Sequence, residues 1–287
     1  MTTADVFGLH RTHLIGVAYR LTGSLADAED AVQEAWPRFA KADGVKDARG
    51  WLTTVVSRIC LDRLRSAAVR RETYVGSWLP EPLLTTGEQD DPLESVVRSD
   101  GVRMAALVVL DRLTPDQRVA FVLHDAFSLP FTEIAEVLQV SEASARQHAS
   151  RARKAVADAE PPPRAALAEQ QEVLEKFLRA MANGDLDAVL ALLHPDAVMI
   201  GDGGGKVRTA VQTVTGADKV ARFFLGLIRK YGFPEEHRPV FVNGELGFTM
   251  PAYGDVTARV TLFTVHEGKV VAVYDIANPD KLTHVAF

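Results

Sequence analysis

Cysteine is almost absent from this sequence. The 287 residues include a single one, Cys60, which excludes an internal disulfide and a cysteine-based metal cluster. We expect Cys60 to be a small buried residue on a helix. No apolar run approaches the roughly 20 residues that span a bilayer, and the N-terminus lacks the basic and apolar segments of an export signal. These absences predict a cytoplasmic protein that uses no metal and no cofactor and does not contact a membrane.

A large positive charge is also lacking. The net charge of −6 argues against a protein that binds nucleic acid tightly on its own. The charges are unevenly spread, however: residues 46–71 hold seven basic and two acidic residues, residues 144–154 hold four basic residues and no acid, and residues 72–100 hold seven acids and one arginine. Two basic segments joined by an acidic one predict two DNA-facing modules in a protein that binds DNA weakly alone.

Hydrophobic periodicity divides the chain into three blocks. Residues 1–74 and 101–160 are helical in pattern, and the stretch between them, 75–100, is a linker rich in Pro, Gly and acids. The third block, 165–287, predicts two helices, strands at 197–201 and 207–214, a helix at 217–231 and further strands with a hairpin turn at Glu267–Gly268. We therefore predict a multidomain protein, with two all-α domains followed by an α+β domain.

Residues 131–150 fit a helix-turn-helix. Ser141 can cap the second helix, which starts at about Glu142, and Gln139 occupies a turn position where glycine is common. Such a helix fits the major groove of DNA, where Arg and Gln can contact base edges and further basic residues can meet phosphates. A solvated basic helix in an ordinary bundle is the alternative. The outward residues are Arg146, Gln147, Ser150, Arg151, Arg153 and Lys154.

Together with this motif, "RLTGSLADAEDAVQEAW" and "WLTTVVSRICLDRLR" resemble the extracytoplasmic-function (ECF) sigma factors over about residues 5–158. The resemblance implies a region-2 domain at 1–74 and a region-4 domain at 101–160. It also implies that the acidic helix docks on the clamp helices of the largest RNA polymerase subunit, and an acidic face suits a basic partner. A merely solvated helix face is the alternative. The implicated residues are Asp27, Glu29, Asp30, Ala31, Val32, Gln33 and Glu34.

The third helix of the first block is similar to the family's reader of the minus-10 promoter element. The resemblance implies that its arginines follow the DNA backbone beside a flipped base; Arg58 stands where many relatives have Asn, which leaves the base preference open. Region 4 would contact the polymerase flap and read the minus-35 element, with Ser144 and His148 joining the basic residues there. His148 replaces an arginine of many relatives. The predicted minus-10 residues are Arg58, Arg63, Arg65, Arg70 and Arg71.

The third block looks like the cone-shaped fold of SnoaL-like proteins and ketosteroid isomerases. With "WLPEP" at 78–82, "DGGGK" at 202–206 and "NPDKL" at 278–282, the chain resembles the sigma subgroup with a fused SnoaL-like domain. In that subgroup the extension is thought to regulate the factor in place of a separate anti-sigma protein. We expect the linker to pack against this domain. The expected contact residues are Trp78, Pro80, Glu81, Asp202, Gly203, Gly204, Gly205, Lys206, Asn278, Asp280 and Lys281.

The glycines of "DGGGK" do not form a phosphate-binding P-loop. That motif needs G-x-x-x-x-G-K-[ST], but Val207 follows Lys206 and Ile200 stands where the first glycine is required. We expect instead a tight, exposed connection in which the three glycines supply positive φ angles.

An enzyme of the cone-shaped fold needs a general base and an oxyanion partner. The sequence settings are unconvincing, and we expect no catalysis; an unidentified small ligand for this domain stays open. Two alternatives to a self-regulated sigma factor remain: an autonomous helix-turn-helix regulator with a ligand-sensing domain, and a cyclase or isomerase with a DNA-binding appendage. The regulator leaves "DAEDAVQE" and the Arg-rich helix without a role. The candidate catalytic residues are His194, Asp202, His237, Tyr253, His266 and Asp275.

Overall fold

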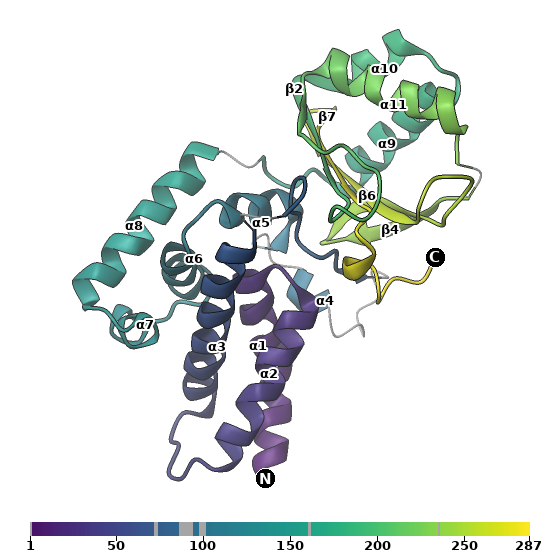
Figure 1. Ribbon diagram of the computed structural model, residues 1–287. Coiled ribbons are helices and arrows are strands. Elements are labelled where there is room, and N and C mark those ends of the chain that lie inside the picture. The colour runs from purple at the N-terminus through teal and green to yellow at the C-terminus, as the bar shows by residue number, and fades with distance from the viewer. Residues whose placement is uncertain (1, 72–73, 86–93, 98–101, 160–161, 235) are drawn as a thin grey trace. The chain divides into compact units, whose positions relative to one another are not determined.

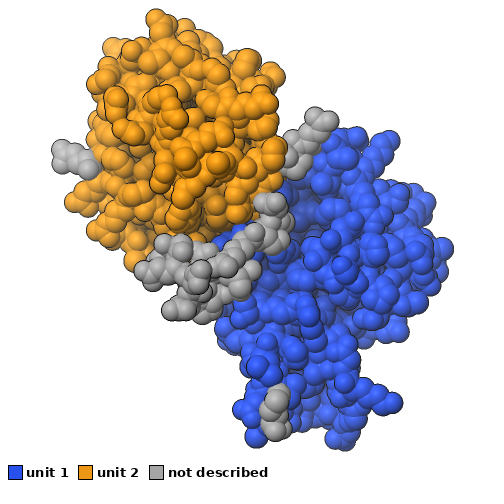
Figure 2. All heavy atoms as spheres, turned by 180° about the vertical axis from the view of Figure 1, so that it is seen from behind, with its two compact units in different colours: residues 1–73, 92–102, 106–161 blue, residues 74–91, 103–105, 162–287 orange. Residues whose placement is uncertain are grey.

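The computed structural model describes residues 2–71, 74–85, 94–97, 102–159, 162–234 and 236–287. The chain forms two compact units, one of residues 1–73, 92–102 and 106–161 and the other of residues 74–91, 103–105 and 162–287 (Figure 2). The first part of the linker thus belongs with the C-terminal unit. Among the described helices, none is long and apolar enough to cross a membrane.

The first unit begins with three helices that lie alongside one another (Figure 1): α1 (Thr3–Thr22), α2 (Leu25–Ala40) and α3 (Ala48–Arg71). Ser24 caps α2 by accepting a hydrogen bond from the amide of Asp27, as its sequence position predicts. Leu14 and Leu52 are among the fully buried residues of this bundle, and Cys60 is buried with them, as expected. A short helix, α4 (Glu94–Val97), belongs to the same unit.

The remainder of this unit carries the helix-turn-helix. α5 (Met104–Asp111) is followed by α6 (Pro115–Phe121), which Thr114 and Gln117 begin with the expected capping box, and by a π-helical turn, η2 (Val122–Ala126). α7 (Phe131–Leu138) and α8 (Glu142–Ala159) form the motif. Gln139, the first of the three residues between them, has a φ of 58°, so that this position needs the left-handed conformation that glycine adopts most easily.

The second unit packs helices against one curved sheet (Figure 1). Its order is α9 (Leu167–Ala182), α10 (Leu186–Leu192), β2 (Leu193–Asp202), β3 (Val214–Thr215), α11 (Ala217–Tyr231), β4 (Arg238–Val242), β5 (Glu245–Met250), β6 (Arg259–His266), β7 (Lys269–Ile276) and the 3-10 helix η3 (Pro279–Lys281). The sheet order is β1-β4-β5-β6-β7-β2-β3, and among the described strands β2 and β7 pair in parallel while the other neighbours pair antiparallel. Between sheet and helices lies a core that includes Phe177, Val220 and Phe263.

Two features of this unit differ from the expectations. Strand β1 (Leu84–Thr85) comes from the linker and pairs with β4 at the sheet edge, which the linker composition did not indicate. The expected strand at 207–214 is wrong apart from its last residue, because this segment crosses close over Gly201: a Cβ there would lie 2.2 Å from the Thr209 hydroxyl. The hairpin turn is confirmed, since Glu267 and Gly268 both have positive φ angles.

Candidate functional site

A buried carboxylate joins the linker to the C-terminal domain. Asp202, at the end of β2, is completely buried. Its oxygens accept hydrogen bonds from the Leu79 amide at 2.8 Å, the Tyr74 hydroxyl at 2.5 Å and the Gly204 amide at 3.0 Å, and the Lys281 ammonium lies 2.6 Å away. We call these five residues the Asp202 hub. A buried charge with a cation and three donors is fully compensated.

Two further residues surround the hub. The Lys281 ammonium also donates to the carbonyl of Leu79 and lies 4.0 Å from the ring centre of Trp78. Asn278 donates from its side chain to the Tyr74 hydroxyl at 2.9 Å. Burial, and then the hydrogen bond to Asp202, raise the pKa of Tyr74, so that this hydroxyl stays a donor well above neutral pH.

The glycine loop is tight, as expected, but only part of it is exposed: Gly205 and Lys206 are exposed, and Gly204 is half-buried. Gly204 and Gly205 have φ angles of 62° and 70°, whereas Gly203 is buried and its φ is not positive, which corrects the expectation of three. A Cβ on Gly204 would lie 2.5 Å from the side-chain nitrogen of Asn278. Close approach of two segments, as well as turn geometry, therefore requires glycine here. Lys206 forms an exposed ion pair with Asp280 at 2.5 Å.

The rest of the linker follows the sheet edge. Pro80 and Glu81 are buried, and Glu81 lies 3.2 Å from the imidazole of His284. The Leu83 amide donates to the side chain of Asn243 at 3.1 Å, next to the pairing of β1 with β4. The structure thus brings most of the expected contact residues together around Asp202, with the Lys206–Asp280 pair beside them and the Glu81–His284 contact further along.

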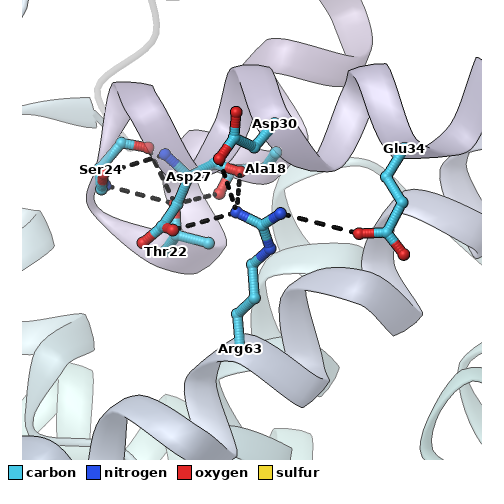
Figure 3. A network of polar contacts seen from close by, with 7 residues as sticks. All are labelled: Ala18, Thr22, Ser24, Asp27, Asp30, Glu34 and Arg63. Carbon is cyan, nitrogen blue, oxygen red and sulfur yellow. Dashed lines mark hydrogen bonds and ion pairs between the residues drawn. The ribbon is translucent and has the colours of Figure 1, made fainter.

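The acidic face of α2 is organised by one cation from α3 (Figure 3). The Arg63 guanidinium lies 3.0 Å from Asp27, 3.6 Å from Asp30 and 3.7 Å from Glu34. Glu29 and Gln33 are exposed on the same helix. Two predicted docking residues are corrected: Ala31 and Val32 are 0% and 2% exposed, because they face the core of the bundle.

The predicted minus-10 arginines do not share one environment. Arg63 points into the acidic cluster of α2 and is paired there with carboxylates, so its DNA contact stays a prediction. Arg58 donates to the carbonyl of Glu136 at 3.0 Å, and Arg65 pairs with Asp116 at 2.9 Å, so that both contact region-4 helices in the same unit. The side chains of Arg70 and Arg71 lie outside the described part of the structure.

The second helix of the helix-turn-helix presents a basic face. Ala145, Ala149 and Ala152 are fully buried on its inner side. Arg146 pairs with Glu142 and lies over the ring of Phe131. Arg153 pairs with Asp125 at 2.7 Å. Ser144 and His148 are half-buried, and the exposed members of the predicted set are Arg146, Gln147, Ser150, Arg151, Arg153 and Lys154.

Three of the six candidate catalytic residues lie apart from one another, and the other three line one cavity. His194 is exposed, His266 lies at the hairpin turn, and Asp202 belongs to the hub. Asp275 lines a cavity with two other candidates, His237 and Tyr253, but three donors already occupy its carboxylate. Within the described residues no group of three or more His, Cys, Asp or Glu could hold a metal ion. Sequence reasoning missed Arg259, the cation that pairs with Asp275.

Comparison with known proteins assigns each part of the chain. Family models match residues 6–70 (Sigma-70 region 2), 103–156 (Sigma-70, region 4) and 174–281 (SnoaL-like domain). The chain is 55% identical to the ECF RNA polymerase sigma factor SigJ of Mycobacterium tuberculosis, across 95% of this chain and 91% of that protein. It is 34% identical to the probable ECF RNA polymerase sigma factor SigI of the same species, across 95% and 92%.

A solved structure agrees with this assignment. The crystal structure of M. tuberculosis SigJ matches with a TM-score of 0.84 and 52% sequence identity, and the match covers 98% of both chains. Regions 2 and 4 and the C-terminal α+β domain therefore occur in the order and fold of that protein. The chain belongs to the ECF sigma factors, with sigma-70 regions 2 and 4 followed by a SnoaL-like domain.

Proposed function

We propose that this sigma factor directs core RNA polymerase to specific promoters and that its own C-terminal domain restrains it by holding the linker. The observation that carries the regulatory part is the Asp202 hub, where a fully buried carboxylate binds the linker at Tyr74 and at the backbone of Leu79. Family membership carries the first part of the proposal, and the two charged faces of the helical unit support it.

The acidic face of α2 is the proposed docking surface for the polymerase clamp helices. Glu29, Asp30, Gln33 and Glu34 are exposed there, and Asp27 is partly exposed. Arg63 neutralises part of this charge and fixes the carboxylates in position. An acidic, ordered face favours association with a basic partner and discriminates against DNA.

The basic face of α8 is the proposed minus-35 reader, and α3 is the proposed minus-10 element. In the helical unit, however, Arg58 and Arg65 of α3 are engaged by the region-4 helices α7 and α6. DNA contact by these arginines requires that they leave their present partners. This supports a factor that binds promoter DNA poorly until core polymerase separates its regions.

The Asp202 hub binds the linker at Tyr74 and Leu79, and we propose that this linker must move when regions 2 and 4 separate. Because the linker connects region 2 to region 4, a domain that holds its first part competes with the extended arrangement on polymerase. We propose that this restraint replaces a separate anti-sigma protein. The SnoaL-like domain acts here as a regulator and not as an enzyme, since the carboxylate best placed in its cavity, Asp275, is occupied by Arg259, Thr209 and Thr261.

Footprinting tests the sigma function. The promoter is selected from a random DNA library with the full chain and core polymerase. We expect protection of minus-35 and minus-10 elements when both are present and weak or no protection by the chain alone. Tight protection by the chain alone would instead identify an autonomous regulator.

Truncation tests the restraint separately. A chain that ends near residue 165 loses the Asp202 hub but keeps both sigma regions. With core polymerase and the selected promoter, we expect more transcript from the truncated chain than from the full chain. Equal transcript from both would remove the regulatory proposal and leave the sigma function intact, whereas no transcript from either chain with core polymerase would remove the sigma function.

A further inference from the structure

The C-terminal unit contains a cavity of about 230 Å³, partly open to solvent, between its sheet and helices α9 and α11. Aromatic rings form much of its wall. The rings of Phe177, Phe224, Phe248 and Phe263 contact one another edge-on, with centroid separations between 5.6 and 6.2 Å. A concave site with a mostly apolar, aromatic wall and several polar groups is typical of a site for a small organic molecule.

The polar groups of the cavity include one strongly held pair. Arg259 lies 3.0 Å from Asp275, and their side chains are only 13% and 4% exposed. Thr209 and Thr261 also donate to Asp275, so with Arg259 three donors occupy this carboxylate, which leaves it little capacity to accept from a ligand. Arg259 uses Nε on the carbonyl of Thr257 and Nη1 on Asp275. Its Nη2 makes no hydrogen bond to the described residues and can donate to a ligand.

Two more polar groups at the cavity lack partners. His237 packs between the rings of Phe233 and Phe248, and its buried Nδ1 has no hydrogen-bond partner in the described chain. The hydroxyl of Tyr253 also makes no hydrogen bond to the described residues, and burial raises the pKa of Tyr253, which keeps it a donor. Buried polar atoms are almost always paired, so the Nδ1 of His237, unpartnered among the described residues, favours a ligand in this cavity, and the Tyr253 hydroxyl is a second group that a ligand could reach.

We infer that this cavity binds a small apolar molecule that carries a carbonyl or carboxylate acceptor. The aromatic wall takes the apolar body, and Arg259 and Tyr253 donate to the acceptor. A cationic head is disfavoured beside Arg259, because the buried carboxylate there, Asp275, is already paired with it. The other two charged lining residues, Arg208 and Asp255, are exposed and opposite in sign. This site does not depend on the proposed regulation, since it rests on a different set of residues from the Asp202 hub.

Two probes of equal shape and opposite charge test the inference. Isothermal titration calorimetry of the full chain is carried out with 2-naphthoate and with 2-naphthylmethylammonium. We expect one site for 2-naphthoate and at least about tenfold weaker binding of the ammonium probe, because one charge-assisted hydrogen bond separates them. Absence of naphthoate binding, or equal affinity for both probes, would overturn the inference.

Variants locate the bound probe. Leu227→Trp fills the cavity and is expected to abolish naphthoate binding, whereas Leu167→Trp, a matched change at an exposed position outside the cavity, leaves it unchanged. Tyr253→Phe removes a hydroxyl that forms no hydrogen bond to any described residue, and it is expected to weaken naphthoate binding severalfold while thermal unfolding stays the same. Unchanged naphthoate affinity in a folded Leu227→Trp chain, or in Tyr253→Phe, would place the probe elsewhere and refute the proposal.

Discussion

The side chain of Asp202 accepts a hydrogen bond of 2.8 Å from the backbone amide of Leu79, although 123 positions separate the two residues. One partner ends the second strand of the C-terminal sheet and the other lies in the linker between the sigma regions. Because the donor is a backbone group, the bond fixes the path of the linker and not one side chain. The linker is thereby part of the C-terminal domain, and the predictions below follow from that arrangement.

Gly204 permits the close approach of the loop to Asn278. We expect Gly204→Ala to destabilise the protein by at least about 2 kcal/mol. The backbone here has a positive φ, which strains a residue with a Cβ, and that Cβ would lie 2.5 Å from the Asn278 side chain. Gly254→Ala is the matched control, with positive φ and open space around the Cβ, and is expected to cost about 1 kcal/mol. Urea unfolding measures the loss of stability in both variants, and equal losses would contradict a close contact between Gly204 and Asn278.

The raised pKa of Tyr74 implies that the folded protein loses stability at alkaline pH. Its pKa is raised in the folded state, so the stabilisation is complete below the ordinary tyrosine pKa of about 10 and declines as the pH rises above it. We expect Tyr74→Phe to be less stable than the parent chain at pH 8 and to lose less stability between pH 9 and 11. Parallel pH profiles of the free energy of unfolding would count against this role.

Arg63 stabilises the acidic face of α2. We expect Arg63→Met to cost about 1 kcal/mol at low salt, since three carboxylates lose their shared cation, and less at 1 M salt, where charges are screened. Arg38→Met, which removes a single exposed pair with Glu34, is the control and is expected to cost about 0.3 to 0.5 kcal/mol. Denaturant unfolding at two salt concentrations measures the loss of unfolding free energy in both variants. Equal losses that do not depend on salt would show that Arg63 does not organise the acidic face.

Cys60 is predicted to be unreactive in the folded chain. It is completely buried, and burial raises the pKa of its thiol to about 12, so almost no thiolate exists at neutral pH. A thiol-specific disulfide reagent at pH 8 should modify it only after denaturation. Ser150→Cys supplies an exposed thiol as the positive control, and rapid reaction of Cys60 in the native chain would show that the helical bundle opens.

Much of this fold could be predicted because the local signals agree with the tertiary structure. Ser24 and Thr114 begin helices as caps, and Glu267–Gly268 forms the hairpin turn. The grouping of "WLPEP", "DGGGK" and "NPDKL" came from the family resemblance, since no local rule connects segments so far apart.

The misses depend on contacts between distant segments. The composition of α3 does not show which of its arginines has acidic neighbours. The packing of α2 against α3 shows that Arg63 faces three carboxylates. Ala31 and Val32 were predicted as surface residues because they lie within a contiguous family motif. Helical periodicity instead directs their side chains toward the core of the bundle. Strand β1 forms only because the edge of β4 is there to pair with it.

The central claim is that the Asp202 hub restrains the sigma factor. Its most direct test is transcription in vitro with core polymerase and the selected promoter, comparing the parent chain with Asp202→Asn and with Lys206→Met, which removes only the exposed neighbouring ion pair. We predict more transcript from Asp202→Asn, because the charge that holds Lys281 and the linker is lost, and parental transcript from Lys206→Met. Parental transcript from a folded Asp202→Asn chain would contradict the account.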